Sequence, residues 1–260
     1  MKENINIVSR DAVSIIQLTR HDNRNSLDWS LVNDLHEALT RVECNSDKVV
    51  ILTGSGSAFC AGGDLKLMRD EFSPLGARDY VDSVSRLVRR IMALEKPVIA
   101  SVNGYASGAG FGLVLACDII IACNEAKFSL AFKNVALIPD SGVTFFLTRA
   151  IGAYRAKLLT FTGGVIEAEE ALRMGFVNQV VTSEELMSVT MKLAKDLAKE
   201  DGVSMARGKK LINHAYTGQN SLHHAIEEEV NVQSLLLLTE EHRERVQRFF
   251  QKKKLRNTGE

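Results

Sequence analysis

The sequence has no apolar run long enough to cross a membrane, since a spanning helix takes about 20 such residues. The N-terminal sequence, MKEN, leads directly into an alternating apolar pattern and lacks the apolar core of a signal peptide. Neither sign of charge is in excess, with 32 Lys and Arg against 32 Asp and Glu. We therefore expect no membrane partner and no nucleic-acid partner.

The four cysteines also lack the patterns of metal sites and redox pairs. No two of them are spaced as Cys-x-x-Cys, and none has the spacing of a zinc site. Cys117 and Cys123 lie among apolar residues, which is typical of buried free thiols. We expect a protein of the reducing cytoplasm that holds no metal.

What the chain does contain is an alternation of short apolar runs and helical periodicity. Val49–Leu52 and Pro97–Val102 are typical of strands covered on both faces, and the apolar positions from Leu31 to Val42 keep a helical period. This order favours βαβ units and a parallel sheet. After about Val181 the strand pattern ends and only helices are predicted. At 260 residues, one domain with a helical extension fits.

Two glycine-rich turns follow predicted strands, at Ser57–Lys66 and Asn103–Gly112. Small residues let a ligand approach the main chain, and the start of a helix offers unpaired N–H donors. Two such turns from neighbouring parallel strands would aim two N–H groups at one oxygen, as in an oxyanion hole. Either turn alone is explained as well by tight turns and close packing. The second turn lacks the G-x-G-x-x-G spacing of a dinucleotide site, and no histidine in either turn supplies the base of a catalytic triad.

The joint pattern resembles the crotonase (enoyl-CoA hydratase/isomerase) superfamily. The resemblance rests on Ser57–Lys66 (SAFCAGGDLK), Lys96–Gly104 (KPVIASVNG) and Ala116–Ile119 (ACDI), and it extends from Asn23 to Phe250. It implies an α/β fold, in which a spiral of repeated ββα units precedes a C-terminal helical region.

The resemblance also implies an organisation and a partner. Residues 1–195 would form the spiral core with the acyl-CoA site, and residues 196–260 the helical region that closes the pocket and makes oligomer contacts. The substrate would be an acyl-coenzyme A thioester, with no separate cofactor. The family assembles as trimers or dimers of trimers, so a homo-oligomer is expected.

The family's functional positions can be carried onto this chain one by one. Its two oxyanion N–H donors fall on Gly63 and Ala109. Ala109 replaces the commoner glycine, which leaves the backbone N–H in place. The coenzyme A contacts fall on Ala61, Asp64, Leu65 and Lys66.

The acids of the family's hydratases are absent. Their two glutamate positions align with Gly112 and Phe132, which are then expected to line the acyl pocket. Asp140 remains, in the sequence LIPDSG, where several isomerases of the family and a dehalogenase place a catalytic aspartate. This stretch is most similar to the isomerases of phenylacetate degradation, which act on ring-1,2-epoxyphenylacetyl-CoA and also shift enoyl-CoA double bonds.

The favoured interpretation is an isomerase in which Asp140 moves a proton while Gly63 and Ala109 hold the enolate, either shifting a double bond or opening an epoxide-type ring. An apolar neighbour such as Phe132 would exclude water and raise the pKa of the aspartate. A turn aspartate with no catalytic role is the simpler alternative.

Two other functions stay open. One is an enoyl-CoA hydratase of fatty-acid or aromatic-acid degradation that uses another acid, such as Asp118 or Glu125. The other is a non-catalytic member that binds RNA or acyl-CoA, and the balanced charge argues against RNA.

Overall fold

The computed structural model describes residues 4–70, 72–218 and 221–258, without the side chains of 70 and 252–258. The chain forms two compact units, residues 1–199 and 200–260. The boundary predicted after residue 195 falls within the last turn of α8 (Leu186–Ala198), and the first unit ends just beyond that helix.

A six-stranded sheet forms the centre of the first unit, in the order β1-β2-β3-β5-β7-β10. Only β1 and β2 pair antiparallel, and the remaining neighbours are parallel. Every residue of β3 and β5 is buried, as expected for parallel strands covered on both faces. The strands are β1 (Ile5–Arg10), β2 (Val13–Leu18), β3 (Val49–Gly54), β5 (Val98–Val102), β7 (Ile119–Cys123) and β10 (Gln179–Val181).

A second, four-stranded sheet has the order β4-β6-β8-β9. Its strands are only three residues long: β4 (Ala58–Cys60), β6 (Tyr105–Ser107), β8 (Lys127–Ser129) and β9 (Val165–Glu167). Each of the pairs β3/β4, β5/β6 and β7/β8 therefore gives one strand to each sheet before the chain turns into a helix or a 3-10 turn. This is the repeated ββα arrangement that the resemblance implied.

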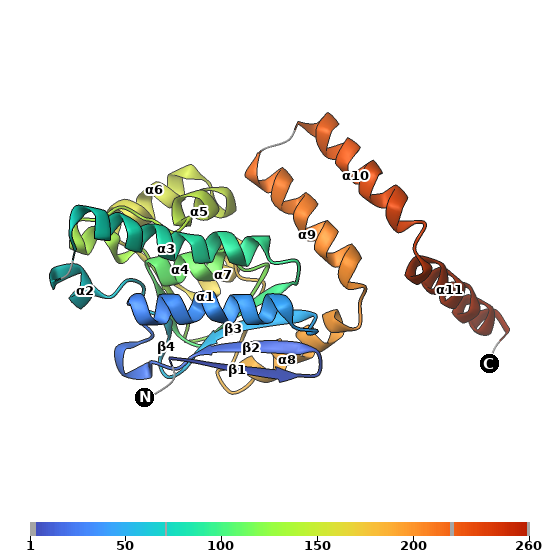
Figure 1. The fold of residues 1–260 in the computed structure, drawn as a ribbon, viewed down its shortest axis with the longest axis horizontal. Helices are drawn as coiled ribbons and strands as arrows, with labels where there is room; N and C mark the ends of the chain where they lie inside the picture. The colour runs from blue at the N-terminus through green and yellow to red at the C-terminus, as the bar shows by residue number, and fades with distance from the viewer. Residues whose placement is uncertain (1–3, 71, 219–220, 259–260) are drawn as a thin grey trace. The chain divides into compact units, whose positions relative to one another are not determined.

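Helices cover the large sheet, and Figure 1 shows α1 and α3 running side by side along it. The N-cap of α1 is Asp28, whose carboxylate accepts the Leu31 N–H at 2.9 Å. Helix α8 packs on β3 and β5, where Thr190 meets Ser101. The helical elements of this unit are η1 (His21–Asn23), α1 (Trp29–Cys44), α2 (Leu65–Asp70), α3 (Pro74–Ala93), α4 (Ala109–Leu115), η2 (Ala131–Val135), α5 (Val143–Ile151), α6 (Ala153–Thr162), α7 (Ala168–Met174) and α8.

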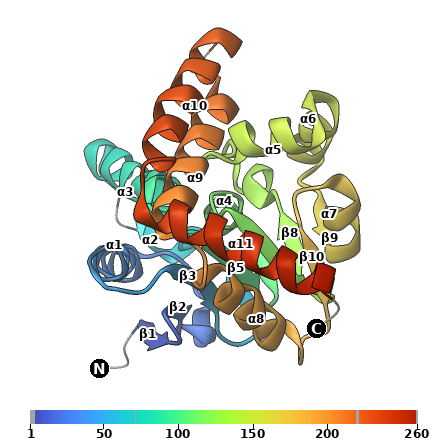
Figure 2. The same cartoon turned by 90° about the vertical axis from the view of Figure 1, so that its right-hand side faces the viewer.

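The second unit contains α9 (Gly202–Thr217), α10 (Leu222–Leu236) and α11 (Glu240–Thr258), which Figure 2 shows from another side. A contact of 3.1 Å between His214 and Glu228 joins α9 to α10. Neither of these helices has a buried residue in the described chain. No described helix combines the length and the apolar character that a membrane span requires.

The cysteines agree with the sequence interpretation. All four are free, and Cys117 and Cys123 are buried as predicted, together with Cys60. Cys44 is exposed.

Candidate active site

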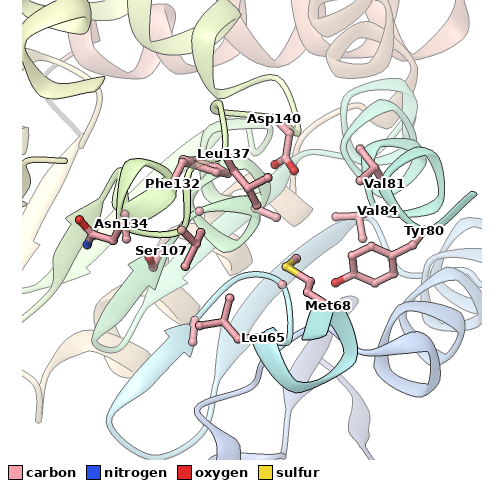
Figure 3. Close-up of a pocket in the computed structure, with 16 residues that line it drawn as sticks. Leu65, Met68, Tyr80, Val81, Val84, Ser107, Phe132, Asn134, Leu137 and Asp140 are labelled. Carbon is pink, nitrogen blue, oxygen red and sulfur yellow. The ribbon is translucent and has the colours of Figure 1, made fainter. Parts of the chain in front are cut away.

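The carboxyl ends of three parallel strands of the small sheet converge on one cavity. Ala61 and Gly63 follow β4, Ser107 ends β6, and Phe132 follows β8. The cavity has a volume of about 230 Å³ and an apolar wall from α2, α3 and η2 (Figure 3). Ligands of α/β proteins bind at this kind of edge, because the loops that leave parallel strands gather there.

The two glycine-rich turns touch each other at the cavity. Gly62 has a φ of +88°, and a Cβ added there would lie 2.6 Å from the Ser107 carbonyl oxygen and 3.3 Å from the Ala109 nitrogen. A side chain at this position would therefore separate the turns. The two glycine-rich turns are therefore neighbours in the fold, as the sequence predicted.

Gly63 and Ala109 both line the cavity, and their N–H groups are available to a ligand. Leu27 N donates to Gly62 O at 2.8 Å and Asp64 N donates to Leu27 O at 3.1 Å, in a parallel bridge between Leu27 and Gly63. Because successive amides of an extended chain alternate in direction, the Gly63 N–H is directed away from Leu27. Ala109 is the first residue of α4, so its N–H has no acceptor inside the helix. Within the described residues neither N–H has a hydrogen-bond partner.

Asp140 lies on the opposite wall, in the loop between η2 and α5. Figure 3 shows its carboxylate directed into the cavity, facing Tyr80 and Val81 of α3. Its Oδ1 is shielded from solvent and has no hydrogen-bond partner among the described residues. Burial raises the pKa of Asp140 above its ordinary value of 3.8. No cation of the described residues appears among the causes of this shift, and a partly buried acid with a raised pKa in a cavity is typical of a functional group.

The two positions that align with hydratase glutamates have different surroundings. Phe132 lines the cavity and is 8% exposed, and its ring lies 3.6 Å from the Cβ position of Gly108. Gly112, also predicted to line the acyl pocket, is buried and is not among the residues that border the cavity. It lies behind the wall, against Ser141.

The predicted coenzyme A contacts also divide into two groups. Ala61 and Leu65 border the cavity, and Lys66 is exposed and does not. Asp64 is used inside the fold: its Oδ2 accepts the Ser26 hydroxyl at 2.9 Å, and its Oδ1 accepts the Lys66 N–H at 2.8 Å. It therefore fastens the start of α2.

Sequence reasoning missed several side chains of the cavity, among them Met68, Tyr80 and Val84. A Cβ on Gly63 would lie 2.3 Å from Met68 Cε, so this thioether covers the first turn. The Tyr80 hydroxyl donates to the Leu27 carbonyl, and burial raises the pKa of the phenol. Tyr80 and Val84 are four residues apart and therefore share one face of α3, and this spacing is the signal that the sequence offers for them.

The other acids considered from the sequence lie elsewhere. Asp118 accepts the Val98 N–H at 2.7 Å, and Glu125 accepts the Ser183 hydroxyl at 3.3 Å. Neither borders the cavity, and Asp140 is the one acidic side chain of the described residues that does. Within the same residues no group of three or more His, Cys, Asp or Glu side chains is arranged to hold a metal ion.

Comparison with known proteins agrees with this geometry. The model of the enoyl-CoA hydratase/isomerase family matches residues 9–259. The 1,2-epoxyphenylacetyl-CoA isomerase of Escherichia coli is 38% identical over 95% of both chains. The crotonyl-CoA hydratase of Syntrophomonas wolfei is 33% identical over 97% of this chain and 96% of its own. The crystal structure of an enoyl-CoA hydratase from Bacillus anthracis superposes with a TM-score of 0.91 at 34% identity, covering 96% of this chain and 97% of the other.

The chain therefore belongs to the enoyl-CoA hydratase/isomerase family and has the crotonase fold. Its relatives include both isomerases and hydratases. Acyl-CoA thioester substrates are consistent with the family, but membership does not determine which of the two reactions the chain catalyses.

Proposed function

We propose that this protein is an acyl-CoA isomerase, in which Asp140 moves a proton on a thioester enolate. The observation that carries the proposal is that Asp140, alone among the acidic side chains of the described residues, lines the cavity to which Gly63 and Ala109 present free backbone N–H groups.

The backbone donors supply the electrostatic part of the reaction. The thioester oxygen binds between the N–H groups of Gly63 and Ala109. When a proton leaves C2, negative charge develops on this oxygen, and donors that are already in position stabilise that charge without reorganising. One such donor contributes about 10²- to 10³-fold to the rate.

Asp140 supplies the proton transfer. Its carboxylate removes a proton from C2 of a 3-enoyl thioester, and the electrons of that bond form a dienolate. The resulting carboxylic acid returns the proton at C4, which gives the conjugated 2-enoyl thioester with no net change in atoms. The raised pKa suits a group that must accept and then release a proton near neutral pH.

The same wall argues against hydration as the main reaction. Adding water to a double bond requires one group to activate the water and another to deliver a proton. Phe132 presents a ring at one of the hydratase positions, and Gly112 presents no side chain at the other. A site with one carboxylate and an apolar wall favours transfer of a single proton within the substrate.

Replacement of Asp140 tests the proposal. We expect Asp140→Asn to lower kcat for conversion of 3-enoyl-CoA to 2-enoyl-CoA by about 10²- to 10⁴-fold. KM should change little, because the backbone donors remain. Ser204→Ala, in the second unit, serves as a control and should keep wild-type turnover. Near wild-type kcat in Asp140→Asn would exclude Asp140 as the proton shuttle.

The similarity to a 1,2-epoxyphenylacetyl-CoA isomerase supports testing ring substrates as well. A panel of straight-chain 3-enoyl thioesters and 1,2-epoxyphenylacetyl-CoA, compared by kcat/KM, identifies the preferred acyl group. We expect Asp140→Asn to lower kcat by a similar factor for every substrate that the wild-type protein isomerises.

A further inference from the structure

Behind the cavity wall, Gly112 of α4 packs directly against the loop that carries Asp140. A Cβ added at Gly112 would lie 2.6 Å from the Ser141 carbonyl oxygen and 2.8 Å from the Ser141 Cβ. Both contacts are far inside van der Waals range, and the nearest atom belongs to the backbone. A side chain at position 112 therefore requires the main chain of the loop to move.

The loop has little room to withdraw. Ser141 is 3% exposed and has a φ of +50°, in the left-handed region that side chains rarely adopt. The next residue, Gly142, packs on Phe146, whose ring lies 2.6 Å from the Cβ position of that glycine. The Asp140 carbonyl accepts the Val143 N–H at 2.9 Å, which ties the loop to the buried start of α5. Ser141 is thus enclosed between two helices.

We propose that Gly112 is a positioning residue that seats the Asp140 loop, and that this contact excludes a second carboxylate from α4. The inference rests on the proposed function, since it explains why one acid acts alone. The carboxylate of Asp140 reaches the cavity only because the backbone of the next residue occupies the space beside Gly112. A glutamate at 112 and an aspartate at 140 in its present position are mutually exclusive.

Gly112→Ala is the first test, with Gly208→Ala as the matched control. No atom lies within 4 Å of a Cβ at Gly208, on a helix of the second unit. We expect Gly112→Ala to lower kcat about 10- to 100-fold through displacement of Asp140, while KM changes less than threefold. The acid limb of its pH–rate profile should also shift, because the exposure of Asp140 changes. Gly208→Ala should have the kcat, the KM and the pH–rate profile of the wild-type protein.

A rescue variant separates positioning from general damage to the fold. Ser141→Gly removes one of the two clashing atoms and relieves the left-handed backbone, so Gly112→Ala/Ser141→Gly should recover part of the lost kcat. Equal kcat in the single and double variants, or wild-type kcat and pH profile in Gly112→Ala, would overturn the proposal.

Gly112→Glu tests the exclusion of a second acid. We expect it to lose isomerase activity and to hydrate 2-enoyl-CoA no faster than the wild-type protein. A gain of hydratase activity with isomerase activity retained would contradict the inference. Failure of the proposed function itself would be recognised by a different result. In that case Asp140→Asn would keep its isomerase activity, regardless of the kcat measured for Gly112→Ala.

Discussion

Asp140 is partly buried on an apolar wall, and its Oδ1 has no hydrogen-bond partner among the described residues. A carboxylate in water has a pKa of about 4, and moving it away from solvent penalises its charged form. Among the described residues, the protein tolerates this cost at the one acidic side chain that lines the cavity with Gly63 and Ala109.

The raised pKa of Asp140 predicts the pH dependence of the reaction. The base is active when deprotonated, so kcat/KM should fall as the pH is lowered through its pKa in the free enzyme. This fall should be centred above 3.8, the ordinary value for aspartate. A pH–rate profile of 3-enoyl-CoA isomerisation measures it. A profile that stays flat down to about pH 4 would contradict the assignment.

The same burial predicts a gain in stability when the charge is removed. A carboxyl group with a raised pKa in the folded state is favourable to folding below its unfolded pKa, and that contribution is lost as the pH rises through the folded pKa. At pH 7 Asp140→Asn should therefore raise the free energy of unfolding by about 1 kcal/mol, and Tm by roughly 2–4 °C. The gain should shrink as the pH approaches 4.

Thermal melts at several pH values measure this difference. The control is Asp196→Asn, at an exposed aspartate that pairs with Lys199 and has a lowered pKa. That variant should show no such gain. A lower Tm for Asp140→Asn at pH 7 would mean that the carboxylate has a stabilising partner in solution.

Some residues of the site could be predicted from the sequence, and others could not. Gly63, Ala109, Phe132 and Asp140 were assigned by motif position, and all four border one cavity. Asp64 was predicted as a ligand contact although an aspartate directly before an apolar helical run is a capping signal. The contact of Gly112 with Ser141 joins residues far apart in the chain, so no local pattern contains it.

At the scale of elements, the site depends on strands of three residues. The predicted buried strands around Val49–Leu52 and Pro97–Val102 are confirmed, since short continuous apolar runs are typical of strands covered on both faces. Strands β4 and β6 lie inside the stretches interpreted as turns, because three residues are too few for a periodicity. Pairing in the second sheet makes them strands, and it also aligns the ends that carry the oxyanion donors.

Helix α3 contributes to the same alignment through Tyr80. Its hydroxyl shares the Leu27 carbonyl with the Asp64 N–H, on the bridge that fixes Gly63. Tyr80→Phe should lower kcat about tenfold, the equivalent of roughly 1.4 kcal/mol in the barrier, because the first donor loses part of its support. Steady-state kinetics measure this effect.

Tyr154→Phe is the control, at a tyrosine that is 89% exposed on α6. We expect wild-type kinetics for it. A reduced Tm in Tyr80→Phe with unchanged kcat would show that the hydroxyl supports only the fold.

The whole molecule divides into a unit with a dense core and a helical unit with little burial of its own. All residues of β3 and β5 are buried, whereas α9 and α10 have no buried residue in the described chain. We expect amide hydrogen exchange to be slowest in β3 and β5 and faster by orders of magnitude in α9 and α10. Mass spectrometry of peptides from the native protein measures this. Equal protection would show that another surface covers these helices in solution.

The central claim is that one carboxylate and two backbone donors make an isomerase rather than a hydratase. In the most direct measurement, the purified protein is incubated with 3-enoyl-CoA and with 2-enoyl-CoA in separate reactions. The concentration of the conjugated thioester is followed over time in both. We predict that the conjugated product accumulates rapidly from 3-enoyl-CoA, while 2-enoyl-CoA gains water at least 100-fold more slowly, the contribution of about one missing general acid or base. Faster hydration than isomerisation would contradict the account.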